Sequence, residues 1–224
     1  METGRARDTL SCVSDGELAS YSLVELALDR LSREILSGRV EPGQRLVEEQ
    51  LTRQLGISRG PLREALRLLA QQGLVEHIPR RGARVATLSD EDVQELYEIR
   101  DLLERHVAAA LPKVLDLTGL RGAVEVMRKA TETGDRFAIA EAHRRFHVEV
   151  VALSGNRQLT ALFESILVRL QLYMAVNLAR EAEVADAADG VRRHERLLDA
   201  VESGDPATIG EALSRHGGRA YLAQ

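Results

Sequence analysis

The chain has little of several residue types, and each shortage excludes a class of protein. Its 224 residues include one cysteine, Cys12, which rules out an intramolecular disulfide and fits a reducing cytoplasm. Tryptophan is absent, and aromatic residues make up only 3% of the chain. No apolar run approaches the roughly 20 residues of a membrane span, and the N-terminus lacks the apolar core of a signal peptide. We therefore expect a cytoplasmic protein with no membrane partner.

The residues that are abundant, Leu, Ala, Arg and Glu, favour helices. The formal net charge is −5, which taken alone argues against a nucleic-acid-binding protein. The charge is unevenly distributed, however, because residues 30–86 carry 11 arginines and six glutamates, a net of +5, and the remainder carries −10. A basic module joined to an acidic one is expected when only one part of a protein meets phosphate groups.

Residues 42–82 have the pattern of two short helices followed by a β-hairpin. Leu51 and Leu55 are four apart and share one face of a first helix, which Gly56 ends. A second helix begins after Ser58, a residue preferred at the N-cap, where its hydroxyl can accept from a first-turn N–H. The apolar residues of this second helix fall on one face: Leu62, Ala65, Leu66 and Leu69. This arrangement is typical of a helix-turn-helix.

The second helix also carries arginines at intervals of four, Arg59, Arg63 and Arg67, which form a stripe on another face. Taken alone, most charge stripes are solvated helix surfaces. Here the stripe coincides with a capped helix N-terminus and with a basic turn at 79–82, between short strands at 74–78 and 83–85. We therefore expect this helix to enter the major groove of double-stranded DNA, with the hairpin as a wing.

The chain is expected to have three parts. Residues 1–18 are polar and expected to be disordered, residues 19–87 form the winged helix-turn-helix domain of three helices and a small β-hairpin, and residues 88–224 form an all-helical domain. The first helix is expected at Ser22–Ser37. Its apolar face is predicted to consist of Leu23, Leu26, Ala27, Leu31 and Ile35.

Every segment after Val85 has a helical pattern. Ser89 begins a helix with a capping box, because the carboxylate of Asp92 lies three residues on. This helix runs toward Leu111, and Pro112 breaks or kinks it. Turn residues separate five further helices, at about 117–132, 135–153, 156–182, 188–203 and 206–221. The predicted fold class is mainly α: a winged helix-turn-helix followed by a bundle of about six helices.

Four histidines have a spacing that could hold a metal ion. His143 and His147 are four apart, so their imidazoles project from one helical face, where two ring nitrogens can reach an ion at about 2.0–2.1 Å. His194 lies near the start of a later helix and His216 on the last one. Two ligands from one helix and one from each of two others can enclose a metal inside a bundle. Taken singly, each histidine is more often a surface residue or a satisfied core residue, and periodicity does not show that the four converge.

Several segments give the chain a clear resemblance to the GntR family of bacterial transcriptional regulators, and within it to the FadR-type group with a C-terminal FCD domain. In the N-terminal part these segments are Leu55-Gly56-Ile57-Ser58-Arg59, Pro61-Leu62-Arg63-Glu64-Ala65-Leu66, Gly73-Leu74-Val75 and Arg81-Gly82. In the C-terminal part they are Tyr97-Glu98-Ile99-Arg100 with Glu104, Phe146-His147, Ser154-Gly155-Asn156, His194 and His216. The resemblance covers about residues 23–217.

The resemblance implies where DNA and metal bind. Contacts to DNA are expected from Ser58, Arg59 and Arg63 of the recognition helix and from Arg81 and Gly82 of the wing. We add Arg45, which precedes both. The resemblance also implies a divalent metal held by residues matching His143, His147, His194 and His216. The family usually has Asp or Asn as first ligand, whereas here it is His143. A donor set of four imidazoles favours Zn, with Ni or Co as alternatives, over Mn or Mg.

Four neutral imidazoles leave the charge of the ion uncompensated, so we expect a small carboxylate effector bound on the metal. Arg100 is an expected partner for the second carboxylate oxygen, and Asn156 a further effector contact. Arg100 could equally form a structural salt bridge to Glu104 or Glu98.

These features predict a ligand-responsive transcriptional repressor that binds a short inverted repeat as a homodimer. In the family, effector binding more often releases DNA than tightens its binding. One alternative keeps DNA binding but makes the metal structural, or itself the signal. Another is a metal-dependent hydrolase, but the segment HRRFH at 143–147 lacks the internal Glu of HExxH that would act as general base. We therefore expect no enzyme activity.

Overall fold

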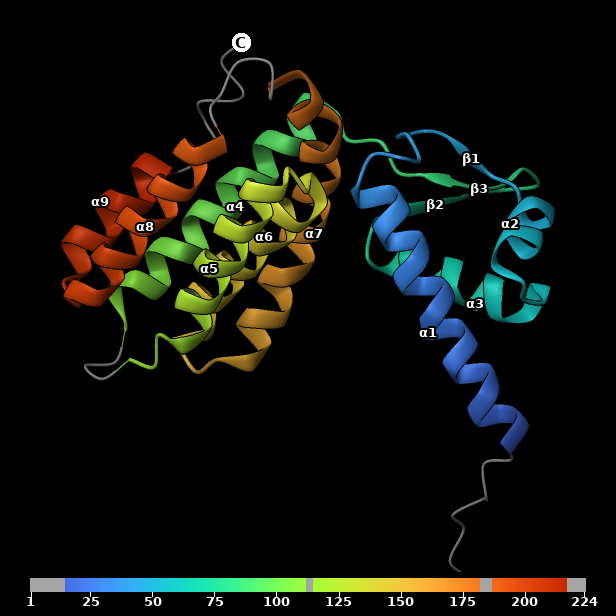
Figure 1. The fold of residues 1–224 in the computed structure, drawn as a ribbon, viewed down its shortest axis with the longest axis horizontal. Coiled ribbons are helices and arrows are strands. Elements are labelled where there is room, and N and C mark those ends of the chain that lie inside the picture. The colour runs from blue at the N-terminus through green and yellow to red at the C-terminus, as the bar shows by residue number, and fades with distance from the viewer. Residues whose placement is uncertain (1–14, 112–114, 182–186, 217–224) are drawn as a thin grey trace, which may run out of the picture.

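The computed structural model of the chain describes residues 15–111, 115–181 and 187–216. Two bodies lie side by side (Figure 1): a small one with three helices and a sheet, and a larger helical bundle. The described residues are mainly helical, and the predicted fold class is confirmed. None of the described helices is long and apolar enough to cross a membrane. Cys12 lies outside the described residues.

In the part of the chain that the structure describes, the small body consists of six elements in the order α1, β1, α2, α3, β2 and β3. Their bounds are α1 Asp15–Leu36, β1 Arg45–Leu46, α2 Glu48–Leu55, α3 Arg59–Gln71, β2 Val75–Ile78 and β3 Gly82–Val85. The three strands form an antiparallel sheet in the order β1-β3-β2, with Leu46 opposite Ala83 and Ile78 opposite Gly82. Strand β1 was not predicted, because a two-residue strand is too short to show an alternating pattern.

Helix α1 begins earlier than predicted. Its first residue is Asp15 rather than Ser22, so residues 15–18, which we expected in a disordered tail, are helical. The sequence Glu-Leu-Ala at 17–19 consists of good helix formers, which the low apolar content of the segment obscured. Residues 1–14 of the expected tail lie outside the described residues.

The buried face of α1 also differs from the prediction. Leu26 is 59% exposed and Leu23 37% exposed. The face that packs against the core is formed instead by Val24, Ala27, Leu31 and Ile35. Since each helical residue turns by about 100°, Leu26 lies nearly opposite the middle of this arc. Helix α1 has more apolar residues than its buried face can hold, and sequence alone did not show which would be left out.

The core of the small body lies between α1, α3 and the sheet. The four residues predicted for the buried face of α3 are buried, and Leu62, Ala65 and Leu69 have almost no exposed surface. Helix α3 ends in a Schellman motif: the Gly73 N–H donates to the Ala70 carbonyl and the Leu74 N–H to the Leu69 carbonyl. Gly73 has a φ of +75°, the left-handed conformation that this motif requires.

Among the described residues the bundle consists of six helices, as predicted. Their bounds are α4 Asp90–Ala109, α5 Thr118–Thr133, α6 Arg136–Ala152, α7 Arg157–Glu181, α8 Ala187–Ser203 and α9 Pro206–His216. The predicted capping box is present: Ser89 Oγ accepts from the Asp92 N–H, and Asp92 accepts from the Ser89 N–H. Pro112, expected to break α4, lies outside the described residues, as do residues 217–221 of the last predicted helix.

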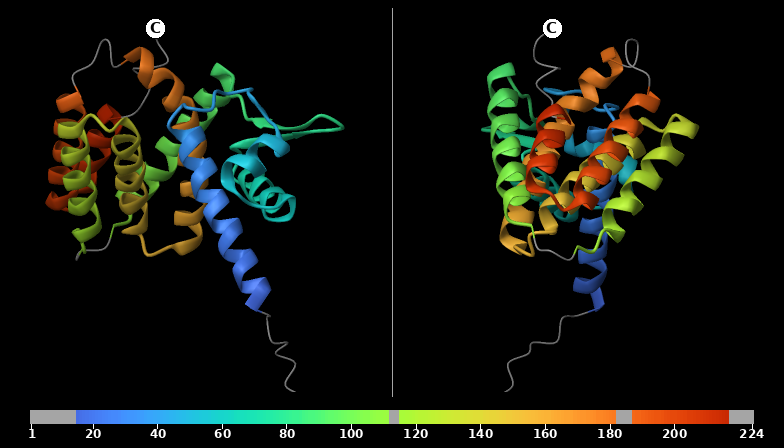
Figure 2. Two further views of the ribbon diagram at one scale, coloured as in Figure 1. Left: turned by 45° about the vertical axis from the view of Figure 1, so that its right-hand side comes forward. Right: turned by 90° about the vertical axis from the view of Figure 1, so that its left-hand side faces the viewer.

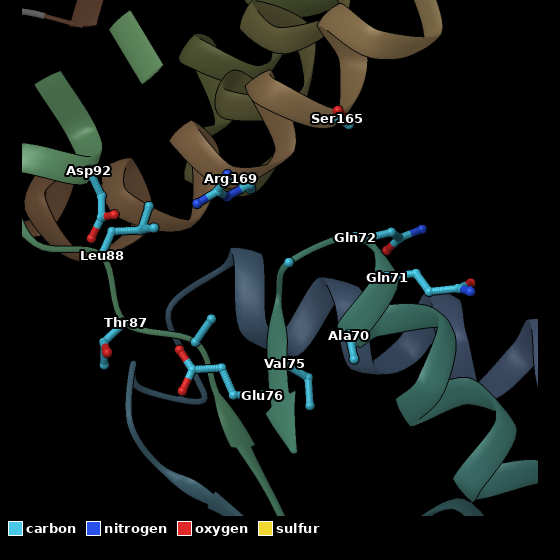
Figure 3. Close-up of a pocket in the computed structure, with 12 residues that line it drawn as sticks. Ala70, Gln71, Gln72, Val75, Glu76, Thr87, Leu88, Asp92, Ser165 and Arg169 are labelled. Atoms are coloured by element: carbon cyan, nitrogen blue, oxygen red, sulfur yellow. The ribbon is translucent and has the colours of Figure 1, made fainter. Parts of the chain in front are cut away.

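Helix α7 joins the two bodies. Its Phe163, Leu167 and Leu170 lie in the bundle core with residues of α4, whereas Leu172, only 1% exposed, lies in the core of the small body. Next to this contact is a cavity of about 560 Å³, with Arg169 of α7 on its bundle side (Figure 3). The rest of its lining includes the end of α3, the start of β2 and the segment 86–88 that leads into α4.

Candidate nucleic-acid and metal-binding sites

The N-terminus of α3 is open to solvent. Ser58 is its N-cap residue, with the extended backbone that this position requires. The predicted capping hydrogen bond is wrong, however, since the Ser58 hydroxyl makes no cap hydrogen bond. Because this bond is missing, the hydroxyl is not used within the helix, and Ser58 is exposed to solvent. This leaves a hydroxyl that can contact another molecule at the helix end.

The predicted arginine stripe of α3 is exposed along its length, at Arg59, Arg63 and Arg67. Arg63 forms an ion pair with Glu48 of α2, and Arg67 forms one with Glu64 of its own helix. Within the described part of the chain, Arg59 has no ion-pair partner. All three side chains are thus presented outward from the face opposite the core.

The β2–β3 hairpin extends away from the rest of the molecule in the left view of Figure 2. Its three-residue turn places Arg80 at a φ of +64° and is followed by Gly82 at +86°. Arg81 and Gly82 are exposed at this tip, as the wing interpretation requires. Arg45, also exposed, lies on β1 opposite Arg84 of β3. The small body therefore presents arginines on α3, on the hairpin tip and on the sheet edge.

The four histidines meet inside the bundle. His143 and His147 come from α6, His194 from α8 and His216 from the end of α9. Their ring centroids lie between 4.3 and 6.1 Å apart. One nitrogen of each ring lies within 4.8 Å of the corresponding nitrogens of the other three. The four side chains, separated by up to 73 positions in sequence, form one cluster that could hold a metal ion.

Two of the rings are oriented by hydrogen bonds at Nδ1. His194 Nδ1 lies 2.7 Å from the carbonyl oxygen of Gly190, and its Nε2 is buried with no hydrogen-bond partner in the described structure. His147 Nδ1 lies 2.6 Å from Glu104 Oε1, a carboxylate–histidine pair that leaves Nε2 as the acceptor. Since buried polar atoms are rarely left without a partner, the free Nε2 of His194 favours a ligand at this point.

Arg100 lies beside the cluster, only 3% exposed. Its guanidinium is 2.9 Å from His147 Nε2 and 3.5 Å from Glu104 Oε1. Of the two salt bridges considered from sequence, the one to Glu104 is present; Glu98 instead accepts from Gln94. For His147 Nε2 to bind an ion, the guanidinium has to turn away from it, which would free donors of Arg100 for an anion.

Burial keeps the cluster neutral. It lowers the pKa of His194 to about 4, and it also holds the pKa values of His143, His147 and His216 well below their usual range, with the charges of neighbouring groups adding to the effect. Burial also raises the pKa of Glu104, an effect that the nearby Arg100 opposes. At neutral pH the four imidazoles therefore have free lone pairs, the form that binds a metal.

The cluster fits an ion held by imidazoles. Nitrogens at about 2.0–2.1 Å from one ion lie about 3.3 Å apart in a tetrahedral arrangement and up to about 4.2 Å apart when opposite each other. The observed limit of 4.8 Å requires only a small tightening of the side chains. Four nitrogen ligands and no carboxylate suit Zn, Ni or Co better than Mg or Ca.

Asn156, predicted as an effector contact, caps a helix in the structure. It is exposed at the N-terminus of α7, where its Oδ1 accepts from the Leu159 N–H. This helix-capping role accounts for the residue, and among the described residues none of its hydrogen bonds reaches the histidine cluster. We therefore keep only Arg100 as a proposed effector contact.

Two partners of the site residues were missed from sequence. Glu104 was considered only as a partner of Arg100, although it also orients His147. A signal for this existed, because a carboxylate on the apolar face of α4 needs more than one partner when it is buried. Glu48, the partner of Arg63, is 15 residues away on another helix, and no local pattern indicated it.

Comparisons with known proteins agree with both halves of the structure. The family described as bacterial regulatory proteins, gntR family, matches residues 23–85, and the FCD domain family matches residues 95–219. A probable D-xylose utilization operon transcriptional repressor of Paenarthrobacter nicotinovorans is 33% identical over 190 residues, which cover 84% of this chain and 82% of that protein.

Two solved structures have a similar fold. One, of a transcriptional regulator GntR from Rhodococcus sp. RHA1, has a TM-score of 0.77 at 24% identity and covers 87% of this chain and 93% of its own. The other, E. coli McbR/YncC, has a TM-score of 0.68 at 26% identity and covers 86% and 92%.

Proposed function

This chain belongs to the GntR family of bacterial regulatory proteins and carries an FCD domain, and from that premise we propose that it is a metal-dependent, effector-responsive repressor. It is a DNA-binding transcriptional regulator and not an enzyme. The finer parts of the proposal are the DNA contacts, the dimer, the metal and the effector. Because bacterial DNA lies in the cytoplasm, we propose that compartment for the protein.

The observation that carries DNA binding is the outward presentation of arginines at the N-terminus of α3. We propose that Ser58, Arg59 and Arg63 contact the operator in the major groove, and that Arg81 with Gly82 contacts it from the wing. Arg45 is proposed as a further contact. Arginine suits this role because its planar fork can donate twice to guanine or to phosphate.

A homodimer is supported by apolar residues left exposed on the bundle. Ile99 and Leu102 of α4 are 43% and 60% exposed, and Leu162 of α7 is 55% exposed. Helices α4 and α7 pack against each other, so these side chains lie on neighbouring elements. We propose that a second copy of the chain covers them. Two-fold symmetry of the dimer would then match an inverted repeat in the operator.

The histidine cluster supports a divalent metal, and we propose Zn held by His143, His147, His194 and His216. The ion would supply a positive charge that attracts an anion into the bundle. We propose that a small carboxylate is the effector and that Arg100 donates to it. Arg100 has the required position, because its guanidinium already lies 2.9 Å from a proposed ligand atom.

The proposed response of DNA binding to the effector depends on α7. This helix packs in the bundle core through Leu170 and in the core of the small body through Leu172. A change in packing around the effector can therefore alter the position of the small body, and with it the separation of two recognition helices in a dimer. We propose that effector binding releases the operator.

The test of DNA binding starts from a pool of random duplexes, because the operator is unknown. The full chain should enrich one inverted repeat, and affinity for it should fall steeply with salt, as expected for about 6–10 phosphate contacts. Arg63→Ala should abolish the preference for the enriched duplex and leave the circular dichroism spectrum unchanged. Retained preference would contradict the recognition-helix assignment, and a flat salt dependence would contradict the electrostatic contribution.

The alternative is that the metal is structural, or is itself the signal. To distinguish these roles, the ion is removed with a chelator, and Zn and a panel of organic acids are then titrated separately against operator binding. The proposal expects release only when both Zn and an acid are present. Release by Zn alone would identify the metal as the signal, and no release by any acid would leave it a structural element.

A further inference from the structure

Glu48 holds Arg63 through the inner nitrogen of the guanidinium, Nε. The Nε of Arg63 lies 3.0 Å from both carboxylate oxygens of Glu48, so the contact joins the start of α2 to the second turn of α3. The two terminal Nη groups of Arg63 make no hydrogen bond to another described residue. The carboxylate therefore binds the inner nitrogen and leaves the outer donors of the guanidinium facing solvent.

The neighbouring arginines are held differently. Arg67 uses both Nε and Nη2 on Glu64, and Arg53 uses Nε and Nη2 on Glu49. Their terminal donors are partly occupied by a residue of the same helix. Bidentate recognition of a guanine edge needs a pair of parallel N–H donors on a fixed guanidinium. Of these three ion-paired arginines, Arg63 alone has both terminal groups available.

The ion pair contributes little to folding, because Arg63 is 64% exposed and Glu48 33% exposed. The ion pair has a larger effect on DNA binding than on folding. It restricts the long Arg63 side chain before DNA arrives, and so reduces the conformational entropy lost on binding. Glu48 also has a cost, because a carboxylate beside the groove repels phosphate groups. A residue that weakens binding to any DNA but orients a base-contacting arginine raises the ratio of specific to non-specific affinity.

We propose that Glu48 is a positioning residue for operator specificity: it fixes the guanidinium of Arg63 for contact with a guanine and lowers affinity for unrelated DNA. This inference rests on the proposed function, because it requires Arg63 to contact bases. It assigns a role in DNA recognition to a side chain that does not itself donate to DNA.

The experiment uses the full chain, the duplex enriched by the wild type from the random pool, and a duplex of shuffled sequence. Glu48→Gln should lower the ratio of the two affinities by about tenfold, within the range of one bidentate base contact. It should also raise affinity for the shuffled duplex about two- to threefold at low salt, since a negative charge is removed. Glu48→Asp, whose shorter side chain cannot keep the contact, should lower the ratio without raising non-specific affinity.

Glu49→Gln is the matched control. It removes the adjacent carboxylate of the same helical turn and also breaks an ion pair with an arginine, Arg53. It should raise affinity for both duplexes together and leave their ratio unchanged. A fall in the ratio equal to that of Glu48→Gln would show a general charge effect and overturn the proposal.

A double-mutant cycle separates positioning from a structural role. Arg63→Lys replaces the fork by an ammonium that cannot donate in parallel, and it should lower the ratio by itself. In that background, Glu48→Gln should change the ratio less than twofold, because its effect passes through the guanidinium. Additive effects would overturn the proposal, as would a ratio for Glu48→Gln within twofold of the wild type. If the wild type enriches no duplex, the proposed function itself fails.

Discussion

The side chain of Arg169 lies against Gly73. A Cβ built on Gly73 would be 3.1 Å from Arg169 Cδ and 3.2 Å from its Cγ. Gly73 closes the end of α3, the proposed recognition helix, and Arg169 comes from α7 of the bundle. The charge of Arg169 also contributes to a lowered pKa of Asp92, after the larger contribution of hydrogen bonds from Ser89. The bundle thus touches α3 directly at its C-terminal end.

Gly73→Ala should destabilise the protein through two separate effects. The left-handed backbone costs about 1 kcal/mol for a residue with a Cβ, and the side chain of Arg169 must also move. Gly56→Ala is the matched control, because Gly56 has a similar φ of +67° but nothing within 4 Å of its Cβ. In urea unfolding, Gly73→Ala should therefore cost more than Gly56→Ala, and Arg169→Ala should remove the difference. Equal costs for the two glycines would contradict the contact.

His147→Ala should lower the metal content per chain. The ring is fully buried and its Nδ1 is fixed by Glu104, so the substitution removes one of the four proposed ligands. Elemental analysis after equilibration with Zn and removal of excess metal measures this directly. The control is His106→Ala, an exposed histidine in the last turn of α4. A metal content unchanged by His147→Ala would defeat the proposed site.

The metal-free protein should lose stability as the pH falls below about 6.5. Burial lowers the pKa of His194 from its usual 6.5 to about 4, so between these values the unfolded chain binds a proton that the folded protein does not. The contribution is fully present above pH 6.5 and is lost progressively toward pH 4, by up to about 3 kcal/mol. Urea unfolding at a series of pH values, with chelator present, gives the size of the effect. His194→Gln should remove this part of the pH dependence and leave the part due to His143, His147 and His216, whose pKa values burial also lowers; a variant as pH-sensitive as the wild type would contradict the assignment.

Leu102→Asp should convert the proposed dimer to a monomer. The side chain is 60% exposed on α4, so an aspartate is tolerated in a single chain but is costly where a second copy covers it. Leu26→Asp is the control, because Leu26 of α1 is 59% exposed in the small body. Light scattering behind a sizing column compares the masses. If Leu102→Asp has the same mass as the wild type, the proposed dimer face is wrong.

The fold could be predicted from the sequence where the interacting residues lie close together along the chain. The face of α3 and the capping box at Ser89 were predicted correctly, since each depends on residues within one or two turns. The cap bond at Ser58 was not formed, although its position was right. Helix α1 has more apolar residues than one face can bury, and Leu26 was wrongly assigned to the buried face.

The candidate site shows the same limit. The spacing of His143 and His147 on one helix indicated two ligands, but their approach to His194 and His216 depends on how α6, α8 and α9 pack. Similarly, the effect of Glu104 on His147 joins α4 to α6, and no local pattern contains it. Residue types at these positions indicated the chemistry, whereas the partners became visible only in the packed bundle.

Leu170 and Leu172 are two residues apart on α7 and lie in different cores. Neither core is complete without this helix, so loss of either body removes apolar contacts from the other. The two domains should consequently melt together, in one transition with one enthalpy, although each has its own hydrophobic interior. A fragment ending at residue 87 would lack Leu172 and expose the surface that it covers, and we expect such a fragment to be markedly less stable than the same residues in the whole chain.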